Sequence, residues 1–161
     1  MRNLRYLLAA ALLSLLVGCG QEQSPTMEST RTPGAQTTDD EGEQGNPTLD
    51  IASPSDGTTV SPGDVEVKLD VANFDVVDKL GEAASAGEGH IHFYIDVDEL
   101  PTEAGKPAVT ADTNTYHAAQ ETSHTWKNVA AGEHVLGAQL VNNDHTPLDP
   151  PVTAKVKVMV Q

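Results

Sequence analysis

The segment from Gly87 to Asp98, GEGHIHFYIDVD, alternates strictly between two kinds of side chain. Successive side chains of a β-strand point to opposite faces, so the pattern predicts a half-buried strand over residues 90–97. Its apolar members belong to a core. Its other face begins with two imidazoles, those of His90 and His92, and this pair is the feature whose role most needs explaining.

Several other segments have the same period of two or a strand-favouring composition, and turns rich in Gly and Pro separate them. Helical periodicity is nearly absent beyond the first eighteen residues. We therefore expect an all-β domain over residues 48–161, an immunoglobulin-like antiparallel β-sandwich of about seven strands. Besides 90–97, the expected strands are 49–51, 65–71, 122–129, 134–141 and 152–160, with a short strand near 107–111 or 114–118.

The first eighteen residues have the pattern of a lipoprotein signal peptide. Arg2 and Arg5 precede an apolar stretch that is too short to span a bilayer, which takes roughly 20 residues. The stretch ends in Leu-Val-Gly before Cys19, the arrangement of a bacterial lipobox, so we expect Cys19 to be lipidated. The alternative is an ordinary signal peptide followed by a chance cysteine. Cys19 is the single cysteine of the chain, so no disulfide forms within it.

The composition of residues 19–47 predicts a disordered acidic linker, because these residues have little apolar surface to bury. Removal of residues 1–18 takes away two arginines and moves the formal charge from −15 to −17. Such a charge argues against binding to nucleic acid. The expected location is the periplasmic face of the outer membrane or the cell surface, with the membrane contacted through the lipid and an envelope protein as a possible partner.

Four segments together resemble a family of small bacterial envelope proteins that is classed as a domain of unknown function. They are IASPSDGTTVSPGDVEV, GEGHIHFYIDVDELP, GEHVLGAQLVNNDHTPLDPPV and AKVKVMV. The shared features are a Gly-His-rich strand, an Asp-His-x-Pro loop and a Pro-Pro pair before the last strand. The resemblance implies an immunoglobulin-like fold and an exported location, and it brings no established activity.

The expected topology brings several histidines to one end of the sandwich. If 90–97 and 134–141 are antiparallel neighbours, the start of the first and the end of the second lie together. The predicted metal ligands are then His90, His92, His145 and His117. Imidazole suits copper or zinc, and two histidines spaced by one residue share a strand face, so we expect a copper or zinc ion as the cofactor.

Further residues complete the prediction. Asp96 and Asp144 could supply a carboxylate or orient an imidazole, and His124 is an alternative ligand. His134, at the start of its strand, should lie at the opposite end.

Two non-enzymatic alternatives remain open, and an enzyme is not expected. The histidines could serve only as loop architecture in a structural or protein-interaction module. The acidic run Asp96–Glu99 could bind calcium, which prefers oxygen ligands. The sequence has neither a Gly-x-Ser-x-Gly nucleophile motif nor a phosphate-binding loop, so we predict that the protein is not an enzyme.

Overall fold

The computed structural model describes residues 45–161, which contain nine β-strands and no helix. The predicted signal peptide, Cys19 and all but the last residues of the predicted linker lie outside the described residues. No segment of the described part is a helix long and apolar enough to cross a membrane. The strands are β1 (Thr48–Ser53), β2 (Thr58–Val60), β3 (Gly63–Ala72), β4 (Asp75–Val76), β5 (Glu88–Ile95), β6 (Tyr116–Ala119), β7 (Ser123–Val129), β8 (Gly132–Val141) and β9 (Pro147–Val160).

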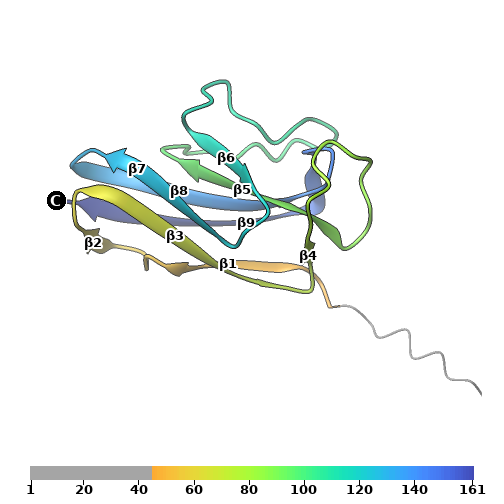
Figure 1. Ribbon diagram of the computed structural model, residues 1–161, viewed down its shortest axis with the longest axis horizontal. Coiled ribbons are helices and arrows are strands. Elements are labelled where there is room, and N and C mark those ends of the chain that lie inside the picture. The colour runs from red at the N-terminus through yellow and green to blue at the C-terminus, as the bar shows by residue number, and fades with distance from the viewer. Residues whose placement is uncertain (1–44) are drawn as a thin grey trace, which may run out of the picture. The chain divides into compact units, whose positions relative to one another are not determined.

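These strands form two sheets, which confirms the predicted immunoglobulin-like β-sandwich (Figure 1). The smaller sheet has the order β1-β3-β7. The larger sheet has the order β2-β9-β8-β5-β4, and β6 also pairs with β5. The count exceeds the predicted seven because β2 and β4 are short additional strands.

The core lies between the sheets and uses the alternating apolar residues that the sequence indicates. Ile91 and Phe93 of β5 are fully buried, and so are Leu136 and Leu140 of β8. From the other sheet, β3 contributes three residues to the same core, namely Val65, Val67 and Leu69. Each strand of the core thus turns every second side chain inward.

The expectation that β5 is half-buried is wrong, because its outer face is covered as well. His90, His92 and Tyr94 on that face are each 0% exposed. The connection between β5 and β6 covers this face. Within it, Ala108 accepts a hydrogen bond from Tyr94, and a Leu100 methyl carbon lies close beside Gly137 of β8. The strand is therefore buried on both faces, although the polar residues of its outer face are typical of a strand face in contact with solvent.

The end of β5 also differs from the expected position. The strand ends at Ile95, and Asp96 has φ of 56°, in the left-handed region that an extended strand does not use. The backbone therefore turns away two residues before the predicted end.

Gly89 gives a test of how tightly β5 packs against β8. A Cβ added at Gly89 would collide with the Val141 carbonyl oxygen and lie 2.9 Å from Phe74 Cζ. At Gly137 the nearest atom is a Leu100 side-chain carbon at 3.0 Å, which can move. We expect Gly89→Ala to lower the free energy of unfolding by about 1–3 kcal/mol or more, and Gly137→Ala to lower it less. Urea denaturation midpoints measure the difference. Equal stability of Gly89→Ala and the parent would contradict this packing.

Candidate metal centre

Two of the predicted ligands are placed by β5 itself. The strand pairs antiparallel with β8, with His90 opposite Val141 and His92 opposite Gln139. Residues two apart on a strand share a face, so both imidazoles and the Tyr94 ring lie on the outer face of the larger sheet. This confirms the expectation that β5 and β8 are antiparallel neighbours.

His145 comes from the loop between β8 and β9, which folds back over β5. The His145 amide donates to the Asn142 carbonyl at 2.9 Å, and the Asn142 amide donates to the Thr146 carbonyl at 2.9 Å. The Asp144 carboxylate accepts from the Thr146 amide at 3.0 Å and from its hydroxyl at 2.6 Å. His145 has φ of 66°, a left-handed conformation that the tight turn imposes. Its side chain is half-buried.

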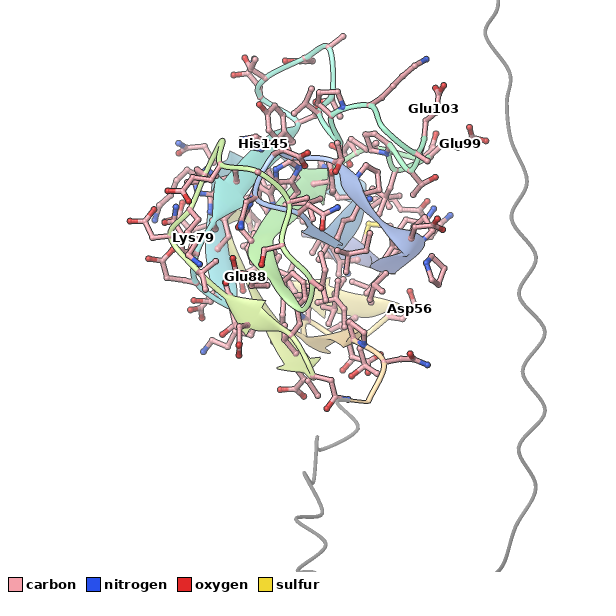
Figure 2. All side chains as sticks on the ribbon, turned by 90° about the vertical axis from the view of Figure 1, so that its right-hand side faces the viewer. Asp56, Lys79, Glu88, Glu99, Glu103 and His145 are labelled. Atoms are coloured by element: carbon pink, nitrogen blue, oxygen red, sulfur yellow. The ribbon has the colours of Figure 1, made fainter. Side chains whose placement is uncertain are left out.

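A second loop, between β4 and β5, holds this turn in place. The Gly81 amide donates to the Asn143 carbonyl at 2.7 Å. The Asn143 side-chain amide donates to Glu88, whose carboxylate also pairs with Lys79 at 2.8 Å. In Figure 2, His145 is seen between Lys79 on one side and Glu99 and Glu103 on the other. The connection between β5 and β6 also reaches His145, because the Ala108 amide donates to the His145 carbonyl at 2.7 Å, so loops from three parts of the sequence meet there.

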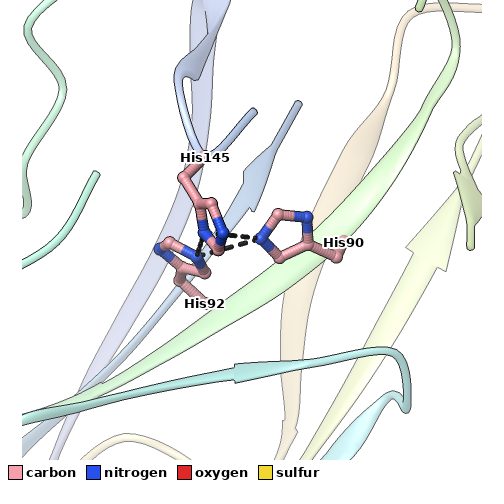
Figure 3. A group of neighbouring side chains, drawn as sticks. All are labelled: His90, His92 and His145. Carbon is pink, nitrogen blue, oxygen red and sulfur yellow. Dashed lines mark hydrogen bonds between the residues drawn. The ribbon is translucent and has the colours of Figure 1, made fainter. Parts of the chain in front are cut away.

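The three imidazoles point one ring nitrogen each toward a common centre (Figure 3). His90 Nε2 lies 3.1 Å from His92 Nε2 and 3.1 Å from His145 Nδ1, and the latter two atoms are 3.0 Å apart. We call these three residues the histidine triangle. The rings are tilted relative to one another by 38° to 78°, so nitrogens converge while the ring faces do not stack.

Protons alone cannot satisfy this triangle when the rings are neutral. A good hydrogen bond needs one N–H and one lone pair, and three mutually touching nitrogens cannot all be paired in this way. Whichever tautomers are chosen, one of the three contacts joins two lone pairs or two N–H groups. A single cation in contact with three lone pairs removes the conflict, because every nitrogen then has the same role.

The surroundings of His92 fix which of its nitrogens carries the proton. His92 Nδ1 lies 2.6 Å from the Ala108 carbonyl oxygen, so Nδ1 bears the hydrogen and donates it. Nε2 of a neutral ring is then a lone pair directed into the triangle. A metal-binding histidine generally has its other nitrogen bonded in this way to a carbonyl or carboxylate. His90 Nδ1, by contrast, is buried and has no hydrogen-bond partner among residues 45–161.

Burial keeps the rings of His90 and His92 neutral near pH 7. The pKa of His90 is lowered to about 4, mainly by removal from water and also by the neighbouring His145, while Asp144 acts in the opposite direction. Removal from water also lowers the pKa of His92 to about 3, although the hydrogen bond to Ala108 opposes this effect. A ligand that is already deprotonated binds a metal without losing a proton.

The donor set fits a transition-metal ion. Zinc bonds imidazole nitrogen at about 2.0–2.1 Å. His90, His92 and His145, whose nitrogens lie 3.0–3.1 Å apart, would hold such an ion together. Three neutral nitrogens suit zinc or copper, whereas calcium and magnesium prefer oxygen. Within residues 45–161, the histidine triangle is the one group of three or more side chains whose possible ligand atoms converge.

The structure does not bring the predicted ligand His117 to the triangle. β6 pairs antiparallel with β5 so that His117 lies opposite Phe93, whereas Ala118 lies opposite His92. Directly paired residues share a face of a sheet, so His117 lies on the face of Phe93 and not on the face of His92. At this end of the sheet the His117 residue is exposed. There His117 stacks on His124 with ring centroids 4.1 Å apart, which also removes the alternative ligand His124 from the triangle.

The predicted acidic partners have other contacts. Asp96 lies at the far end of β5, where its carboxylate is 2.9 Å from Nδ1 of His134. This agrees with the expectation that His134 is at the opposite end, and it removes Asp96 from the site. Asp144 neighbours His145 but its carboxylate oxygen bonds to Thr146, and its remaining influence on His90 is through charge. The acidic run Asp96–Glu99 forms no converging group.

Sequence reasoning missed the groups that support the triangle from outside. The Ala108 carbonyl accepts from His92 and, at 2.7 Å, from the Tyr94 hydroxyl. That hydroxyl also lies 3.0 Å from the side-chain oxygen of Gln139. The position of Tyr94 and Gln139 beside the histidines could have been inferred, because both occupy alternate strand positions on the outer face of the larger sheet. That of Ala108 could not, because the contact uses a backbone carbonyl in a long irregular connection.

Residues 65–161 match the protein family described as a domain of unknown function, DUF4399. The chain belongs to this family. The DUF4399 match covers β3 to β9 and thus all three residues of the histidine triangle. No curated protein matches the chain.

Solved structures similar to this DUF4399 domain include fibronectin(III)-like modules of Clostridium thermocellum CbhA, at 18% identity and a TM-score of 0.41, covering 70% of this chain and 94% of that chain. The PKD domain from human KIAA0319 is similar at 15% identity and a TM-score of 0.35, and the match covers 83% of this chain and 92% of that chain. An engineered protein is similar at 14% identity and a TM-score of 0.38, and the match covers 72% of this chain and 20% of that chain. These likenesses concern the fold alone.

The lowered pKa values predict that acid destabilises the metal-free domain. The rings of His90 and His92 take up protons in the unfolded chain near their ordinary pKa of 6.5, but in the folded state only near 4 and 3. The unfolded state therefore binds more protons between these values, and stability falls as the pH falls below about 6.5. We expect His92→Gln, which does not titrate, to flatten this dependence.

The measurement is the urea denaturation midpoint in chelator between about pH 7.5 and about pH 4.5. His134→Gln is the control, because that ring lies at the other end of β5. If the denaturation midpoint of His92→Gln falls with pH as steeply as the midpoints of His134→Gln and the parent, the prediction is wrong.

Proposed function

We propose that this protein is a lipid-anchored cell-envelope protein that binds one transition-metal ion, copper or zinc, through His90, His92 and His145. The single observation that carries the proposal is the set of three nitrogen–nitrogen distances of 3.0–3.1 Å within the histidine triangle. Proton placement leaves at least one of these contacts repulsive, and a bound cation makes all three favourable.

The surroundings of the triangle support a metal over a purely architectural role. Two of the rings are fully buried and neutral, and a buried imidazole with an unpaired lone pair is costly unless something binds it. The hydrogen bond from His92 Nδ1 to Ala108 leaves Nε2 as a ligand atom. The role we infer is binding and holding of the ion, without catalysis.

The second candidate is a structural or protein-interaction module without a metal. One observation favours it: the same His92–Ala108 hydrogen bond also ties a long connection to the sheet. In that case the triangle is loop architecture, and one of its contacts must be relieved by displacement of a ring. The two candidates differ in whether the purified protein binds a metal.

The metal proposal is tested with the full-length chain, purified without a histidine tag. We expect one zinc or copper ion per chain, measured by elemental analysis and by competition with a chromophoric chelator. His90→Ala and His92→Ala should each weaken binding more than about 100-fold, because every nitrogen ligand contributes several kcal/mol. His134→Ala is the matched control and should bind as the parent does, since its ring pairs with Asp96.

Loss of binding counts only if the variants remain folded. Circular dichroism and thermal unfolding in chelator establish this for each variant. Binding by His90→Ala and His92→Ala that equals binding by the parent would remove the metal proposal and favour the structural module.

The anchoring proposal rests on the Leu-Val-Gly-Cys pattern at residues 16–19. We expect Cys19→Ser to abolish incorporation of labelled fatty acid and to move the protein from the membrane fraction to the soluble fraction of a bacterial host. One acyl-bearing cysteine is the attachment point, so its removal leaves no covalent lipid. Unchanged labelling and fractionation of Cys19→Ser would contradict lipidation at this residue.

A further inference from the structure

The connection between β5 and β6, residues 96–115, is held onto the sandwich through Ala108. Within residues 96–115, Ala108 is the single buried residue, at 0% exposure, while Val109 beside it is 38% exposed. The connection is otherwise fixed near its ends. The Gln139 side chain donates to the Pro101 carbonyl at 3.2 Å, and the Ile95 amide donates to the Thr115 carbonyl at 3.0 Å.

The backbone amide and the backbone carbonyl of Ala108 both form hydrogen bonds to residues in or beside the histidine triangle. Its amide donates to the His145 carbonyl at 2.7 Å. Its carbonyl accepts from His92 Nδ1 at 2.6 Å and from the Tyr94 hydroxyl at 2.7 Å. One buried residue of the connection is thus bonded to two of the three residues of the histidine triangle.

The bond from His92 to Ala108 requires the same tautomer that metal binding requires. With Nδ1 protonated, Nε2 is a lone pair that faces His90 and His145, and a metal ion there satisfies all three rings. Without the ion, every choice of tautomers leaves at least one repulsive contact within the triangle. Moving the His92 proton to Nε2 does not remove that conflict, and it places a lone pair on Nδ1 opposite the Ala108 carbonyl oxygen at 2.6 Å. A displacement of the His92 or His145 ring that relieves the contact therefore disturbs a residue to which Ala108 is bonded.

We propose that metal occupancy of the histidine triangle controls the docking of residues 96–115 on the outer face of β5 and β8. The inference rests on the proposed metal binding. In the loaded protein the connection covers Tyr94 and Gln139. In the metal-free protein the anchor at Ala108 weakens, and the connection opens locally while the sandwich stays folded.

Coupling of this kind is reciprocal, so the docked connection also strengthens metal binding. Tyr94 then acts as a positioning residue, because its hydroxyl contacts the Ala108 carbonyl and not the ion. Tyr94→Phe should weaken zinc binding by roughly 10–100-fold, the range typical for groups that orient metal ligands. Tyr116→Phe is the matched control: its ring also lies beside His92, with centroids 5.6 Å apart, and its phenol is not part of the Ala108 anchor.

The test is amide hydrogen exchange of the full-length chain, followed by mass spectrometry, with zinc and with chelator. We expect zinc to slow exchange of the peptide around Ala108 by roughly tenfold or more, with little change in β3 of the other sheet. His145→Gly tolerates the left-handed backbone and removes the ligand while keeping the carbonyl that accepts from Ala108. In that variant zinc should leave exchange around Ala108 unchanged. Tyr94→Phe should show faster exchange there than Tyr116→Phe.

Separate outcomes distinguish the two proposals. If zinc binds stoichiometrically but exchange around Ala108 does not change, the docking inference is wrong and metal binding stands. If zinc slows exchange equally in β3 and around Ala108, the effect is global stabilisation and the docking inference is again wrong. If zinc does not bind, both proposals fail together.

Discussion

Three mutually touching imidazole nitrogens are the constraint on which the rest of this structure depends. In a pair of rings, one tautomer choice gives a good hydrogen bond. In a triangle, no choice does, so the arrangement calls for a cation or for a displaced ring. The conflict matters because His90 and His92 are fully buried, so bulk solvent does not reach their rings. Burial of β5 on both faces is therefore what turns a common sequence pattern into a candidate metal centre.

The sequence predicted the sandwich and the convergence of three of the four residues named as metal ligands, for reasons that the structure makes clear. Strict alternation in β5 assigned His90 and His92 to one face, and antiparallel pairing with β8 brought the following loop to the same end. His145 lies in that loop. These inferences need the parity of strand residues, which local sequence encodes, and the strand order of an immunoglobulin-like sandwich, which follows from the fold class.

The errors arise where one residue of register decides the face. His117 lies near His92 along β6, but the pairing puts Ala118 opposite His92 and turns His117 to the face of Phe93. A shift of one residue would reverse the two, and the short β6 offers too little alternation to fix its register from sequence. Asp96 fails for a different reason, since it follows the last residue of β5 at the end away from the triangle, beside His134.

The connection from 96 to 115 shows why an irregular segment of this length needs an external anchor. Fixing each backbone residue costs about 1–2 kcal/mol of conformational entropy, and a long stretch with one buried residue recovers little through apolar burial. Its order must come largely from hydrogen bonds, and those at its centre converge on Ala108. The bond from His92 depends on a tautomer that the triangle must tolerate. If the triangle holds an ion as proposed, the stability of the connection and the occupancy of the triangle are coupled in one equilibrium. That coupling would give a buried strand face a reason to carry histidines where apolar side chains would pack more simply.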